Sequence, residues 1–181
     1  RAWMADFAST ESDYYAGAAV SMIFKNLPTA WRDGSDLAAR EAMALASHYG
    51  GLALNMGGLG YVHAIAHQLG AYHGIPHGRA NAIVLPHILE FNRRVSAKRL
   101  SELARRVGLA DPHLSDEQAT DLFIDHVKNL LKELKINVQV PNMNADDFPA
   151  MVKAAFAEAH GKYAVPKYMD EDDIIRVLQA L

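Results

Sequence analysis

The chain has 181 residues, half of them hydrophobic, and carries a formal net charge of -3. This length supports the core of one domain, and the negative charge leaves no surplus of positive residues for a nucleic-acid partner. Cysteine is absent, which excludes disulfide frameworks and cysteine-bound metal sites. The sequence shows neither a signal peptide nor an apolar run of about eighteen residues, so we expect a cytoplasmic protein without a membrane span.

The N-terminal third is predicted to be helical. A first helix starts near Thr10, and Pro28 is expected to interrupt it after residues 25–26. Ser35 is expected to cap a long alanine-rich helix, in which Gly50 and Gly51 are candidates for a break. Apolar residues recur every three to four positions in both segments, which favours helix over strand.

The remaining sequence continues this pattern. The histidine-rich residues 62–78 are followed by five segments with helical periodicity, namely residues 79–92, 96–108, 116–134, 144–161 and 170–181. An alternation at residues 136–140 is too short to build a sheet. The sequence therefore predicts an all-α fold of about seven or eight helices, with residues 1–181 as a single helical domain.

Two charge clusters have simple structural interpretations. Six basic residues between 93 and 106 lie at helical spacings beside apolar positions and predict a solvated helix face, since no base-stacking aromatics alternate with them. Four acidic residues at 170–173 precede the last segment, where carboxylates favour a helix N-terminus, so no metal is needed to explain them.

Four of the nine histidines lie in one stretch, VHAIAHQLGAYHGIPHG, at residues 62–78. If residues 59–72 form a helix, His63 and His67 share one face because they are four residues apart. The turn that follows can then bring His77 toward His63. Neutral imidazole suits Zn, Fe, Ni and Cu, so this spacing is compatible with a metal site.

On spacing alone, a structural interpretation of the stretch stays open beside the metal site. A single histidine on an apolar helix is more often a structural residue than a ligand. Six glycines nevertheless favour the tight turns and close approaches of a crowded site: Gly57, Gly58, Gly60, Gly70, Gly74 and Gly78. An HExxH metalloprotease is excluded, because Ala64 follows the first histidine. His87 is an intermediate case, and the histidines outside these positions are expected to be structural or exposed: His48, His113, His126 and His160.

Residues 58–87, GLGYVHAIAHQLGAYHGIPHGRANAIVLPH, resemble the signature of the iron-containing (group III) alcohol dehydrogenases. The family carries a similar G-x-x-H-x-x-x-H-x-L-G pattern followed by P-H-G-x-x-N-A-x-x-L-P-H. Residues 26–47 and 162–178 are also similar to the family, so the resemblance covers essentially the whole chain. It implies the helical domain of the dehydroquinate synthase-like fold that these enzymes share.

The resemblance implies different roles for the four histidines of the stretch. His63 and His77 match the family histidines that coordinate the catalytic divalent metal, usually Fe(II) and sometimes Zn(II). His67 matches a histidine beside the metal, which implies a role in proton transfer near the substrate or nicotinamide. His73 matches a variable position and is expected to be structural. The remaining ligands, an Asp and a His in a D-x-x-x-H segment, would lie upstream of Arg1.

The resemblance also implies what the chain is part of. In the family, an N-terminal nucleotide-binding domain precedes the helical domain, and this sequence resembles only the latter. We therefore expect residues 1–181 to be the C-terminal part of a longer homo-oligomeric enzyme. That enzyme would interconvert a small alcohol and an aldehyde or ketone with NAD or NADP, whereas the chain by itself would be inactive.

Three alternatives stay open at this stage. The nearest is a zinc enzyme similar to glycerol dehydrogenase, although the PHG and LPH elements fit the iron group better. Another is a stand-alone helical module that binds a metal or a partner without redox chemistry. The last is a purely structural helical domain, in which the glycines serve helix packing.

Overall fold

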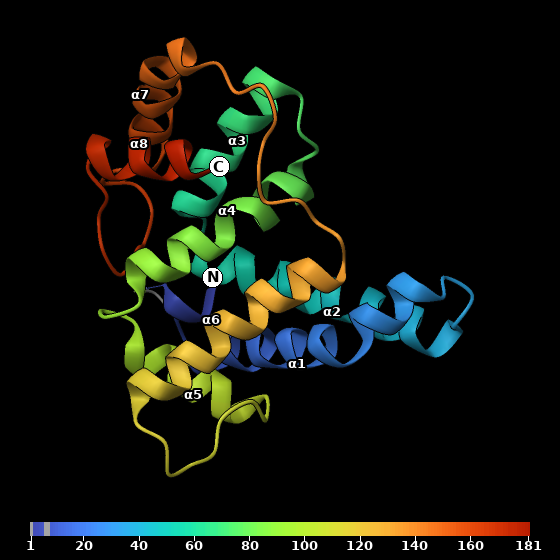
Figure 1. Ribbon diagram of the computed structural model, residues 1–181. Helices are drawn as coiled ribbons and strands as arrows, with labels where there is room; N and C mark the ends of the chain where they lie inside the picture. Colours follow the sequence, from blue (N-terminus) through green and yellow to red (C-terminus); the bar gives the residue numbers. More distant parts are fainter. Residues whose placement is uncertain (1, 6–7) are drawn as a thin grey trace.

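The computed structural model describes residues 2–5 and 8–181, and within these ranges the chain is all-helical (Figure 1). The described part contains eight α-helices and two 3-10 helices and no strand, which confirms the predicted all-α fold. Residues 136–140 form no strand. The elements in chain order are η1 (Ala2–Met4), α1 (Thr10–Arg32), α2 (Leu37–Gly57), α3 (Tyr61–His73), α4 (His77–Asn92), α5 (Ala97–Arg106), α6 (Asp116–Glu133), η2 (Ala145–Asp147), α7 (Phe148–Ala159) and α8 (Glu171–Ala180).

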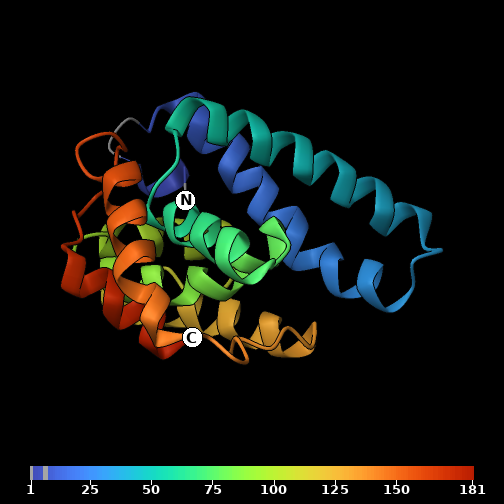
Figure 2. The ribbon, with the colours of Figure 1, turned by 90° about the horizontal axis from the view of Figure 1, so that it is seen from above.

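Helices α1 and α2 form a long antiparallel hairpin that projects from the rest of the chain (Figure 2). The predicted interruption at Pro28 is wrong, because α1 continues through this residue to Arg32. The candidate break at Gly50 and Gly51 is also wrong, since α2 is continuous from Leu37 to Gly57. Each helix packs along the other, and such tertiary packing outweighs the local cost of a proline or glycine.

Side-chain caps set the starts of several helices. Ser9 and Ser12 form a capping box at α1, and Ser115 with Gln118 forms another at α6. Asp170 caps α8, so the acidic run does stabilise a helix N-terminus. At α2 the cap is Asp36, which accepts a hydrogen bond from the Ala39 amide at 2.9 Å, and the prediction of Ser35 is wrong.

Two apolar clusters form the core, and α4 contributes to both. One cluster joins α3, α4, α7 and α8 around Ile65, Ile83 and Met151. The other joins η1, α1, α2, α4, α5 and α6 around Leu100 and Ile124. Because α4 is fixed from both sides, its first residues have a defined position relative to α3. In the part of the chain that is described, no helix is long and apolar enough to cross a membrane.

Candidate metal centre

The corner between α3 and α4 positions the histidine stretch. Helix α3 is capped at its C-terminus by Gly74, which adopts a left-handed conformation with φ of 64°, a geometry that favours glycine. Its amide donates to the Gly70 carbonyl at 3.0 Å. After Ile75 and Pro76 the chain reverses, and α4 begins at His77. The turn that the sequence predicts near Gly74 and Pro76 is therefore present.

This corner brings three imidazoles together. The ring centroids of His63 and His67, one turn apart on α3, are 5.9 Å apart. The ring of His77 lies 5.3 Å from each of them. Two neighbouring histidines of one helix therefore share a space with the first residue of the next helix, as the spacing predicted.

The separation between the His77 ring and each of its two neighbours is compatible with an ion between imidazoles. Two imidazoles on one tetrahedral ion, with metal–nitrogen bonds of about 2.1 Å, place their centroids roughly 5 Å apart. The separation of 5.3 Å between His63 and His77 agrees with this value. Among the described residues, however, no group of three or more His, Cys, Asp or Glu side chains is arranged to hold a metal ion. The described residues of the corner therefore do not form a complete ligand set by themselves.

Glu158 forms a hydrogen bond with the His67 ring. Its Oε1 lies 2.9 Å from His67 Nδ1 and also accepts a hydrogen bond of 2.9 Å from the Tyr163 hydroxyl. Because a carboxylate only accepts, His67 carries its proton on Nδ1, and Nε2 of the neutral ring keeps a lone pair. Helix α7, which carries Glu158, packs against α3. Sequence reasoning missed both partners, since nothing in the local pattern links positions 67 and 158.

Asn81 restrains the His77 ring from the next turn of α4. Its side-chain amide donates to the His77 carbonyl at 2.9 Å and lies 3.2 Å from the ring Nε2. His77 itself is exposed at the helix start, so this contact limits its rotation without burying it. The sequence offered one signal for Asn81, which is the helical i to i+4 spacing from His77.

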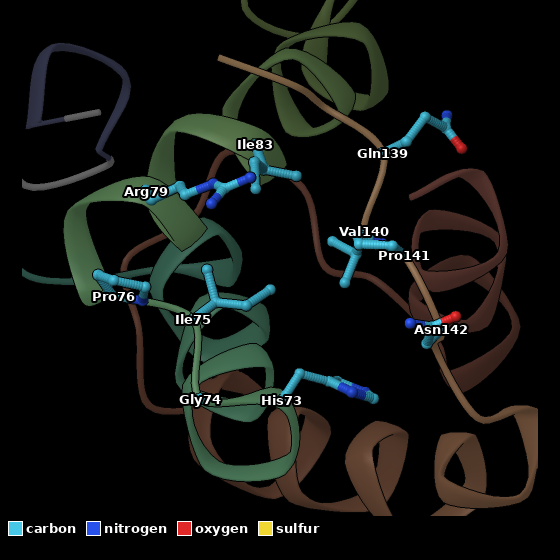
Figure 3. A pocket seen from close by; sticks show the side chains of 10 residues that line it. All are labelled: His73, Gly74, Ile75, Pro76, Arg79, Ile83, Gln139, Val140, Pro141 and Asn142. Atoms are coloured by element: carbon cyan, nitrogen blue, oxygen red, sulfur yellow. The ribbon is translucent and has the colours of Figure 1, made fainter.

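The fourth histidine of the stretch lies apart from the other three. His73 ends α3 and lines a pocket with residues of the α3–α4 turn and of the segment after α6 (Figure 3). His87 on α4 is half-buried, and desolvation by burial, with a further contribution from Lys128, lowers its pKa below the ordinary 6.5. His126 and His160 pack against the rings of Phe24 and Phe156, in agreement with structural roles.

The comparisons with known proteins agree on one group. The C-terminal model of the Fe-containing alcohol dehydrogenase family matches residues 2–181. The chain is 33% identical over 180 residues to 1,3-propanediol dehydrogenase of Citrobacter freundii, covering 98% of this chain and 46% of that protein. It is 43% identical over 138 residues to the probable alcohol dehydrogenase EutG of Escherichia coli (strain K12), covering 76% of this chain and 33% of that protein.

A solved structure matches nearly the whole chain. The crystal structure of a 1,3-propanediol oxidoreductase superposes with a TM-score of 0.92 at 33% identity, covering 99% of this chain and 47% of that one. The chain thus spans about half the length of the first of these relatives and of this structure.

Proposed function

This chain belongs to the Fe-containing alcohol dehydrogenase family, and we propose that it is the helical, metal-binding part of an enzyme that interconverts an alcohol and an aldehyde or ketone. The cosubstrate in this proposal is NAD or NADP. The observation that carries the proposal is the convergence of His63, His67 and His77 at the α3–α4 corner. The names of the relatives, a propanediol dehydrogenase and a probable alcohol dehydrogenase, support the reaction class.

His63 and His77 would hold a divalent metal, Fe(II) or Zn(II), through neutral ring nitrogens. When bound, such an ion acts as a Lewis acid that favours an alkoxide and polarises a carbonyl. The two histidines come from different helices, so packing of α3 against α4 sets the distance between them. Asn81 also restrains the ring of His77, which limits the variation of this distance.

His67 serves as the proton acceptor for the substrate hydroxyl. Its Nδ1–H donates a hydrogen bond to Glu158. Nε2 is therefore the nitrogen that receives the proton of the hydroxyl and returns it in the reverse reaction. Tyr163 donates to the same carboxylate and limits its rotation.

The rest of the catalytic machinery lies outside this sequence in our proposal. An N-terminal nucleotide-binding domain would supply the nicotinamide site and the remaining metal ligands, because no complete ligand set is present among the described residues. A small alcohol or aldehyde would bind between the two domains. We further propose a cytoplasmic homo-oligomer as the working form.

The test compares the chain with its longer parent protein. Alcohol-dependent reduction of NAD and NADP is measured for both, with bound iron and zinc quantified in the same samples. We expect activity in the parent and none in the isolated 181 residues. Equal activity of the two proteins would overturn the proposed division of labour, and an inactive, metal-loaded parent would overturn the dehydrogenase function. Zinc as the sole activating metal would favour the enzyme type similar to glycerol dehydrogenase.

A further inference from the structure

A pocket of about 400 Å³ lies beside the α3–α4 corner and contains none of the three clustered histidines. One wall comprises His73 and Arg79 with the turn between them, and the facing wall is the segment of Val140, Pro141 and Asn142 (Figure 3). A volume near this value lies in the range of about 300–1,000 Å³ that small-molecule sites occupy. The pocket is therefore large enough for a small organic ligand.

Arg79 brings an unpaired positive charge to this pocket. It lies in the first turn of α4, is exposed, and makes no ion pair or side-chain hydrogen bond with any residue in 2–5 or 8–181. No Asp or Glu lines the pocket. The guanidinium thus presents its planar fork of donors, which matches the paired oxygens of a phosphate or carboxylate.

His73 lines the same pocket and carries a buried polar atom. Its Nε2 has no hydrogen-bond partner among the described residues. A buried polar nitrogen without a partner is unfavourable, so such atoms call for a specific reason. Because this nitrogen is closed off from solvent, a rotation of the ring is needed to bring it to a ligand in the pocket.

The start of α4 adds positive potential. This helix has 16 residues, and its N-cap, Pro76, provides no side-chain hydrogen bond to the first amides. Free amides and the helix dipole at such an end favour an anion. Apolar side chains of Ile75, Ile83 and Val140 line the pocket as well, and by displacing water they strengthen its electrostatic interactions.

We propose that this pocket binds a small oxyanion of the phosphate class, either inorganic phosphate or a phosphomonoester. Arg79 is the bidentate partner, the ring of His73 offers a further hydrogen bond once it rotates, and the positive end of the α4 dipole adds to the potential. Arg79 and His77 are two residues apart and project about 200° apart around the helix axis. The anion site therefore lies on the side of α4 away from the clustered imidazoles, and the proposal does not depend on the dehydrogenase activity.

The test is a titration of the 181-residue chain with inorganic phosphate at low ionic strength, followed by calorimetry and by amide NMR spectra. We expect saturable binding, with the largest amide shifts at Gly78 and Arg79. Arg79→Ala should weaken binding by about tenfold or more, because it removes the charge-assisted pair. The phosphate affinity of Arg79→Lys should lie between those of the wild type and Arg79→Ala. His73→Phe, which preserves a ring of similar size, should lose less affinity than Arg79→Ala.

The matched control is Arg40→Ala. Arg40 is also an exposed arginine in the first turn of a helix, but its helix is capped by Asp36 and the residue lies outside the pocket. The Arg40→Ala variant should bind phosphate with the same affinity as the wild type. Melting curves establish that each variant is folded. Absence of saturable binding, or equal losses in Arg79→Ala and Arg40→Ala, would overturn the proposal.

Two further ligands test whether the pocket prefers the phosphate class over carboxylates. Glycerol 3-phosphate should bind at least as tightly as inorganic phosphate, because the pocket has room beyond one anion. Acetate should bind more weakly, since it carries a single charge and fewer acceptor oxygens. Acetate binding tighter than that of phosphate would contradict the assignment to the phosphate class.

Discussion

His67 Nδ1 lies 2.9 Å from Glu158 Oε1, although the two residues are 91 positions apart in the chain. The pair connects α3 to α7 and gives one histidine of the corner a defined tautomer. Such carboxylate partners orient imidazoles in metal and acid/base sites, where their loss costs about 10–100-fold in function. Glu158 is therefore a positioning residue in the proposed reaction.

Replacement of the carboxylate tests this role. In Glu158→Ala, we expect kcat of the parent enzyme to fall about tenfold or more with a smaller change in KM. Tyr163→Phe should have a weaker effect in the same direction. Nitrogen NMR of the 181-residue chain provides a second measurement, since the Nδ1–H tautomer should dominate only when Glu158 is present.

The control for this variant is Glu171→Ala, an exposed carboxylate in the first turn of α8. Its kcat and pH profile should match those of the wild type. An unchanged His67 tautomer in Glu158→Ala would mean that the contact has no positioning role.

The metal assignment predicts a specific pattern among histidine variants. His63→Ala and His77→Ala should each lower the metal content and activity of the parent by about two orders of magnitude or more, because each removes a direct ligand. His67→Ala should retain more metal than either while losing activity. His113→Ala, at an exposed loop position, should behave as the wild type. Full metal content in the His63→Ala, His77→Ala double variant would rule out the site.

The α3–α4 corner depends on the left-handed conformation of Gly74. A β-carbon there meets no neighbouring atom, but a φ of 64° strains any other residue. Gly74→Ala should therefore lower the free energy of unfolding by about 1–2 kcal/mol. The opposite effect is expected for Gly51→Ala, because Gly51 is exposed inside α2 and an added β-carbon meets no neighbouring atom. The free energy of unfolding should rise by about 0.5–1 kcal/mol in this variant. Denaturant unfolding of both variants measures the difference, and equal effects would contradict it.

His87 predicts a pH dependence of stability. Its pKa in the folded chain lies below 6.5, so between that pKa and 6.5 the unfolded chain binds more protons than the folded one. Stability is thus fully present above about pH 6.5 and decreases as the pH falls through the folded pKa. His87→Asn should remove this part of the acid sensitivity. Melting temperatures of both proteins across this range provide the measurement, and parallel curves would show that His87 does not contribute.

Local signals in the sequence were sufficient for most of the helices. Apolar periodicity defined the helical segments, the acidic run marked the start of the last helix, and the turn after the histidine pair placed the corner before His77. Local signals failed at Pro28, Ser35 and the glycine pair of α2. In the α1–α2 hairpin, contacts along the whole length of two helices outweigh the preferences of single residues.

For the site, local signals were enough to predict the common face of His63 and His67 and the return of the chain at His77, because helical spacing and turn residues act over a few positions. Which side chains complete these groups depends instead on the packing of distant segments. Glu158 reaches His67 because α7 packs on α3, and Arg79 faces residues 140–142 because the segment after α6 crosses the α3–α4 corner. Both juxtapositions depend on apolar burial between distant segments, and burial is a property of the assembled fold that no local pattern specifies.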